Sequence, residues 1–145
     1  MIQRIQSIFL LVAALAVGSL FKFPFATTSM AVEPYFSDMK YMINDDMILM
    51  GLTVLTGILI IAAIFLYQNR PLQKRVTLVS LILSFFTAIV AVWLIYSKAS
   101  EWSSEMVLND GLGIYATAFT FICLIAANYF ISKDEKTVRS MDRLR

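Results

Sequence analysis

Histidine is absent from this chain of 145 residues, and cysteine occurs once, at Cys123. A single cysteine excludes an internal disulfide, and with it a thiol oxidase that cycles between paired cysteines. The lack of histidine excludes a serine protease that uses histidine as its base, and it excludes zinc sites built on imidazole. The five glycines are scattered and form no phosphate-binding loop. We therefore expect no enzyme, no catalytic residue, no metal site and no cofactor.

Charge is also scarce. Charged residues make up 15% of the chain and hydrophobic residues 59%, whereas soluble domains have about 25% and 45–50%. The apolar runs 48–67, 76–96 and 112–131 contain no Asp, Glu, Lys or Arg, and the run 5–23 contains only Lys22. Each run is close to the roughly 20 residues that a helix needs to cross a bilayer. The sequence predicts an all-α fold, a single membrane domain 1–145 with four antiparallel transmembrane helices.

The first run has a second interpretation. Arg4, the apolar stretch and the small residues at 29–31 also fit a secretory leader with its cleavage site. We expect a true span here.

The few basic residues are unevenly distributed between the two ends of the predicted bundle. Nine of the twelve Lys and Arg residues lie in the N-terminal segment, the turn 68–75 and the tail 132–145, and three lie on the other side. Basic residues in short loops favour the cytoplasm. We therefore expect both termini in the cytoplasm, in a multi-pass protein of a bacterial cytoplasmic (inner) membrane. The long outer loop 24–46 is too apolar for a free linker, and we expect it to pack over the bundle with a short helix near 33–43.

Small and weakly polar residues recur on the predicted helices. Such faces let membrane helices approach closely, and they either seal the protein's own bundle or dock a span of a partner. Asn128 is the most polar residue at depth, and we interpret it as a hydrogen-bonding residue between helices. The predicted helix-packing residues are Ala14, Gly18, Ser80, Ser84, Ala88, Gly113, Thr117, Thr120 and Asn128.

The tail 132–145 alternates basic and acidic residues and can continue the fourth helix. It is either a solvated helix whose basic groups lie on anionic lipid or a cytoplasmic docking helix. Nucleic acid is not an expected partner, because three acidic residues offset five basic ones and the tail has no aromatic residue.

Three segments carry a resemblance. The opening Met1–Gln6, the turn Asn69–Arg75 and the ending Lys133–Arg145 resemble a family of small four-span inner-membrane proteins from Bacteroidota, a domain of unknown function. The resemblance covers the whole chain. It implies an inner-membrane location and assigns no activity and no catalytic residue.

These observations lead to an expected function. We expect a non-enzymatic accessory or assembly subunit of a larger membrane complex, whose partners are membrane lipids and other integral membrane subunits. The alternatives are a small oligomeric transporter or channel, with a path lined by Ser80, Ser84, Thr117, Thr120 and Asn128, and a binder of lipid or quinone in a groove between spans. The predicted cytoplasmic contact residues are Gln3, Arg4, Gln6, Asn69, Arg70, Gln73, Arg75, Lys133, Lys136, Arg139, Arg143 and Arg145.

Overall fold

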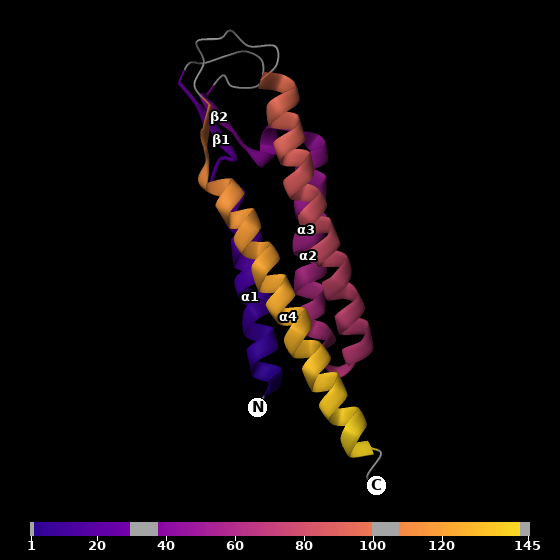
Figure 1. Cartoon of the computed structure of the whole chain (residues 1–145). Coiled ribbons are helices and arrows are strands. Elements are labelled where there is room, and N and C mark those ends of the chain that lie inside the picture. The colour runs from indigo at the N-terminus through magenta and orange to yellow at the C-terminus, as the bar shows by residue number, and fades with distance from the viewer. Residues whose placement is uncertain (1, 30–37, 100–107, 143–145) are drawn as a thin grey trace.

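The computed structural model describes residues 2–29, 38–99 and 108–142, and in this part of the chain four helices lie side by side (Figure 1). They are α1 (Ile2–Ser19), α2 (Met47–Phe65), α3 (Arg70–Ala99) and α4 (Leu112–Asp142). Each helix packs against the one before it and the one after it in the chain, and α1 packs on α4, which closes the ring. The predicted antiparallel bundle of four helices is thereby confirmed. Both described ends of the chain lie at one end of the bundle, here called the inner end.

Apolar surface covers the outside of the bundle. Met47–Gln68, Arg70–Ser97 and Leu112–Val138 are long and apolar enough to cross a membrane, and Ile5–Ser19 is a shorter apolar helix. Large side chains such as Leu15, Phe65 and Ile122 are more than half exposed on the bundle surface. Exposed apolar surface of this extent suits lipid rather than water. The fold is therefore that of a membrane protein.

A small sheet closes the opposite end, here called the outer end. Its strands are β1 (Ala26–Thr28), β2 (Lys40–Tyr41) and β3 (Leu108–Asp110), in the order β2-β1-β3 with both pairings antiparallel. The sheet thus joins the segment between α1 and α2 to the residues that lead into α4. Strands of two or three residues give too short an alternation to be recognised in a sequence.

The segment that follows α1 packs over the outer end, as predicted. Phe25, Tyr41 and Ile43 are fully buried, or nearly so, in one apolar cluster with the ends of α2 and α3. We call this cluster the outer plug, and its members are Leu20, Phe25, Ala26, Tyr41, Ile43, Leu49, Ala91, Leu94 and Ile95. Burial of these side chains away from water at the membrane surface stabilises the cap.

Several element boundaries differ from the sequence predictions. The first helix ends at Ser19 and the chain turns through Leu20–Phe23, where the span was expected to continue. Pro24 follows this turn, and the residue before a proline is disfavoured in helical conformation. The short helix predicted near 33–43 is wrong for residues 38–42, which contain β2, and its residues 33–37 lie outside the described part. A 3-10 helix η1 (Ile43–Asp45) begins at the end of the predicted range, and a second one, η2 (Leu66–Gln68), follows α2. The tail does continue the fourth helix, to Asp142.

Gly111, which directly precedes α4, and Gly51 of α2 allow a matched test of the packing at the outer end. The backbone nitrogen of Gly111 donates to the carbonyl of Phe25 at 2.9 Å, and a Cβ on Gly111 would collide with the backbone of Pro24 and Phe25. We expect Gly111→Ala to destabilise the protein by about 1–3 kcal/mol through this overpacking. Gly51 lies exposed on α2 with no atom within 4 Å of its Cβ position. Gly51→Ala should instead be neutral or stabilise the protein by up to about 1 kcal/mol.

The measurement is the thermal unfolding of the purified protein in detergent. A Gly111→Ala variant that unfolds at or above the wild-type midpoint would contradict the close approach of the α4 start to Pro24 and Phe25.

Candidate functional site

A stripe of polar residues runs along the face of α3 that points into the bundle. The stripe consists of Gln73, Thr77, Ser80, Ser84 and Thr87, and all five side chains are buried. Their spacings of four, three, four and three residues keep them on one face of a helix with 3.6 residues per turn. The face of α3 that was predicted from its small hydroxyl residues thus lies in the bundle interior.

Hydroxyl groups from the neighbouring helices face the same interior. Thr53 and Thr56 of α2 and Thr117 and Thr120 of α4 are buried to 4% exposure or less. Each of these hydroxyls donates a hydrogen bond of 2.7–2.9 Å to the carbonyl four residues earlier in its own helix. The donors are therefore satisfied without a partner helix, and an interior of this polarity is compatible with a membrane.

The hydroxyl groups nearest the outer end surround a small cavity on the inner side of the outer plug. Its volume is about 10 Å³, and it is lined by Val17, Leu20, Thr53, Thr56, Ser84, Thr87, Thr117 and Thr120. A cavity of this size holds about one water molecule. The structure thus has a hydroxyl-lined chamber in its outer half with no room for a larger molecule.

An apolar layer separates this chamber from the inner end. Leu10 of α1, Ile60 of α2 and Leu124 of α4 are completely buried in a second apolar cluster. The fully buried side chains of this layer come from three helices, whereas the polar stripe of α3 continues through Thr77 and Ser80.

At the inner end, polar side chains connect all four helices. The side-chain amide nitrogen of Gln6 in α1 donates to the side-chain oxygen of Gln73 in α3 at 3.5 Å, and the amide nitrogen of Gln73 donates to the carbonyl of Ala63 in α2 at 3.0 Å. Arg70 of α3 forms an ion pair with Asp134 of α4, with Nε 3.4 Å from Oδ2. We call Gln6, Arg70, Gln73 and Asp134 the inner polar cluster.

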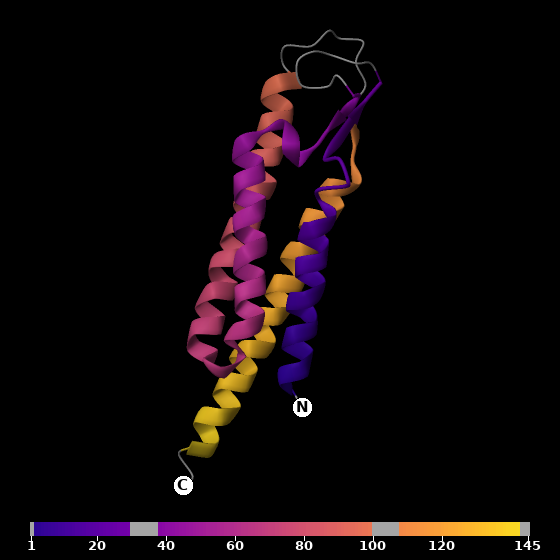
Figure 2. The same cartoon turned by 180° about the vertical axis from the view of Figure 1, so that it is seen from behind.

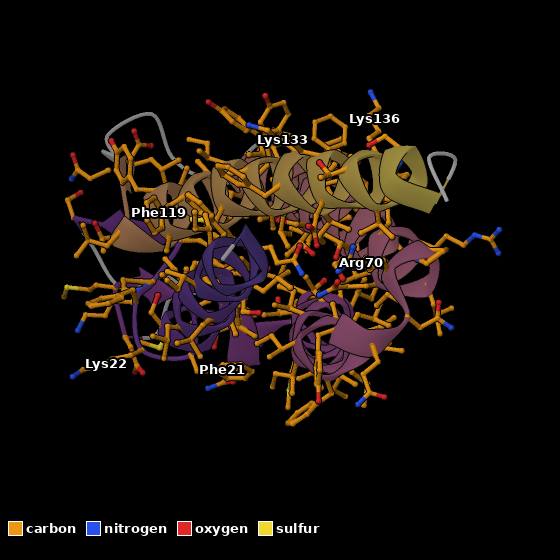
Figure 3. All side chains as sticks on the ribbon, turned by 90° about the horizontal axis from the view of Figure 1, so that it is seen from below. Phe21, Lys22, Arg70, Phe119, Lys133 and Lys136 are labelled. Carbon is orange, nitrogen blue, oxygen red and sulfur yellow. The ribbon has the colours of Figure 1, made fainter. Side chains whose placement is uncertain are left out.

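Charges at the inner end are sorted by sign. Asp134 and Glu135 of α4 face α3, where they pair with Arg70 and Lys74; the Lys74–Glu135 distance is 3.5 Å. Figure 3 shows Arg70 directed between the helices. In the same view Lys133 and Lys136 project from the far side of α4. Asp134 and Glu135 thus form their ion pairs between α3 and α4, and the basic groups of Lys133 and Lys136 remain on the surface.

The structure divides the predicted contact residues into three groups. Asn69, Arg75, Lys133 and Lys136 are exposed, as a contact surface requires. Gln6 and Gln73 are 0% exposed, so the prediction that they contact a partner is wrong: their amides are used between helices. Arg70 is largely enclosed by its ion pair. The side chains of Gln3, Arg4 and Arg139 and the whole of Arg143 and Arg145 lie outside what the structure describes.

The predicted helix-packing residues also separate by position. Ser80, Ser84, Gly113, Thr117 and Thr120 are buried in the bundle, and Ala14, Ala88 and Asn128 are half-buried. Gly18 is exposed, with no atom within 4 Å of the place of a Cβ, so it does not seal this bundle. Its use against a partner's span stays a prediction.

Sequence reasoning missed the two ion pairs and the inward orientation of Thr53 and Thr56. The ion pairs had a usable signal. Basic residues at the start of α3 and acidic residues near the end of α4 come to the same level in an antiparallel pair of helices. Among the described residues, no group of three His, Cys, Asp or Glu side chains could hold a metal ion.

Comparison with known proteins gives one match. Residues 2–144 match the family described as Domain of unknown function (DUF4293). No curated protein and no solved structure shows significant similarity to the chain. The match covers nearly the whole chain and brings no activity with it.

The amide contact between α1 and α3 can be tested by a double-mutant cycle. We expect Gln6→Leu and Gln73→Leu each to destabilise the protein by about 0.6–1.7 kcal/mol, the scale of hydrogen bonds between membrane helices. Gln73→Leu should cost more, because it also leaves the carbonyl of Ala63 without its donor. The double variant should cost less than the sum of the two, because each single change leaves a buried amide unpaired.

The measurement is the thermal unfolding of all four proteins in the same detergent. Strictly additive effects of the two substitutions would show that the amides do not interact.

Proposed function

We propose that this chain, which belongs to the DUF4293 family, is a non-enzymatic accessory or assembly subunit of a larger complex in a bacterial inner membrane. The observation that carries the proposal is the length of α4. Its 31 residues extend about 46 Å at 1.5 Å per residue, and the hydrocarbon core of a bilayer is about 30 Å thick. The inner part of α4 projects past the ends of the other helices (Figures 1 and 2).

The part of α4 from which the projection starts is bound to α3. The Arg70–Asp134 and Lys74–Glu135 ion pairs fix its first turn beyond the membrane-facing run. Partly enclosed pairs of this kind set geometry more than they add stability. A helix held in one orientation loses less conformational entropy when a partner binds it, which favours a docking role.

The exposed groups near this projection are mainly basic. Lys133, Lys136 and Arg75 form no ion pair with any residue that the structure describes. A partner with an acidic cytoplasmic surface complements them, and such complementarity favours encounter and orientation. In this proposal all four helices span the membrane, and the excess of basic residues at the inner end supports a cytoplasmic location of that end.

Site-specific photocrosslinking in native membranes tests the docking role. A photoreactive amino acid in place of Lys136 should yield a crosslink to one integral membrane protein or its cytoplasmic domain. The same group in place of Lys22, which is exposed near the outer end of the bundle, is the control and should not yield this product. Lys133→Glu combined with Arg75→Glu should lower the yield several-fold, because the charge complementarity is reversed.

Purification of the protein from the same membranes in mild detergent can contradict the proposal. If the chain runs alone and Lys136 crosslinks only to lipid, the accessory role fails and a lipid-facing role for the basic residues replaces it.

A small oligomeric transporter is the second candidate, and the polar stripe of α3 favours it. Single cysteines in a Cys123→Ser background at Ser80, Ser84, Thr117, Thr120 and Asn128 would test the path. If the path exists, these thiols should react with water-soluble thiol reagents. Cysteines at Val79 and Ile82, which are exposed on the side of α3 that points away from the bundle, are the controls and should stay protected by lipid. Uniform protection of all positions would contradict transport.

A further inference from the structure

Two buried amide oxygens in the inner half of the bundle, Oε1 of Gln6 and Oδ1 of Asn128, receive no hydrogen bond from any described residue. Oδ2 of Asp134 is also buried without a hydrogen bond, although the Nε of Arg70 lies 3.4 Å from it in the ion pair. Gln6 is 0% exposed. An acceptor buried without a donor is unfavourable, and such groups in native proteins usually bind ordered water.

The unpaired oxygens lie beside contacts that are unusually long. The Gln6–Gln73 hydrogen bond measures 3.5 Å, the contact of Arg70 with the carbonyl of Asp134 measures 3.5 Å and the ion pair of the same residues 3.4 Å. The hydroxyl–carbonyl bonds of the four axis threonines measure 2.7–2.9 Å. Polar contacts near 3.5 Å are those in which a bridging water is common. The contacts of Gln6 and Arg70 are thus long, whereas Gln73 bonds the carbonyl of Ala63 at 3.0 Å.

The chemistry of the three atoms selects the ligand. All are acceptors, so the ligand must donate. The guanidinium of Arg70 lies next to Asp134 and disfavours an added metal cation through repulsion. Water is neutral, donates two hydrogen bonds and also accepts, so it can serve both the unpaired oxygens and the nearby guanidinium.

The inner polar cluster is accessible from the inner end. The side chains of Arg70 and Asp134 keep 22% and 11% of their surface exposed, so the cluster borders the solvent at the cytoplasmic face. Above it, Leu10, Ile60 and Leu124 form the completely buried apolar layer. Layers of this kind exclude water from membrane proteins.

Asn128 shares the side of α4 that faces α3. Phe121, seven residues earlier and therefore on nearly the same helical face, lies against Phe85 of α3 with ring centroids 5.9 Å apart. Asn128 therefore lies on the α3 side of α4, about one and a half turns before Asp134 in the helix.

We propose that the inner polar cluster, with Asn128, is a binding site for internal water, entered from the cytoplasmic face and closed above by the apolar layer. This water site is independent of both proposed functions, because it requires neither a partner protein nor a transported molecule. In this proposal the inner polar cluster is hydrated, and the hydroxyl-lined chamber is not part of the site.

Water-edited solid-state NMR on the wild-type protein in liposomes tests this, with water itself as the probe. Polarisation from water should reach the side-chain amides of Gln6 and Asn128 nearly as fast as that of Gln68, which is exposed at the inner end. The methyl groups of Leu10 and Ile60 should gain it several-fold more slowly. Because no substitution is needed, loss of folding cannot imitate either result.

Two outcomes would overturn the proposal. If Gln6 and Asn128 gain polarisation as slowly as Leu10, the cluster is dry and no water is bound. If Thr117 and Thr120 gain polarisation as fast as Gln6, the apolar layer does not exclude water. The bundle then has a continuous water path, as the transporter proposal requires, instead of a site that is entered from one end.

Discussion

Gln73 ties three helices together at the inner end through one side chain. Its amide nitrogen bonds the carbonyl of Ala63 in α2, and its oxygen accepts from Gln6 of α1. The same first turns of α3 hold α4 through Arg70 and Lys74. In lipid the exposed apolar surface supplies little force that distinguishes one helix arrangement from another, because lipid tails are as apolar as leucine side chains. Directed polar contacts at one end and the sheet at the other therefore select this arrangement.

The interior of the bundle follows from the same constraint. Ser and Thr are small enough to let helices approach, and their hydroxyls can satisfy themselves on their own backbone. Thr53 and Thr117 show this at 2.8 and 2.9 Å. The buried hydroxyls thus fill space without demanding partners. The longer amide and carboxylate side chains near the inner end instead require partners on other helices. The polar contacts between helices are therefore found at that end.

Much of the fold follows from the sequence, because uninterrupted apolar runs have few other structures open to them. The hydroxyl face of α3 was also predictable, since its spacing has the period of a helix. Gln6 and Gln73 were not. A polar residue near the end of a span either reaches the headgroups or turns inward, and only the neighbouring helices decide which. The three short strands form by pairing between segments that are far apart in the chain, so no local sequence pattern predicts them.

Charge at the inner end requires the same distinction. Nine basic residues on one predicted side favour one orientation in a membrane, but their number does not tell which of them contact a partner. The ion pairs remove Arg70 and Lys74 from the free surface and leave Lys133, Lys136 and Arg75. The family match adds no activity to this picture. The case for a docking role therefore depends on geometry, above all on the length and fixed direction of α4.

The pairing of β1 with both β2 and β3 bears on how the protein is made. β1 and β2 emerge with the first two helices, whereas β3 follows α3 and directly precedes α4. β1 can therefore complete its second edge only after α3 has been made and Leu108–Asp110 lies at the outer end of the bundle. Until then the edge of β1 stays open and Phe25 lacks the backbone of Gly111 as its donor. A chain interrupted before β3 thus exposes an unpaired strand edge, a feature that promotes aggregation.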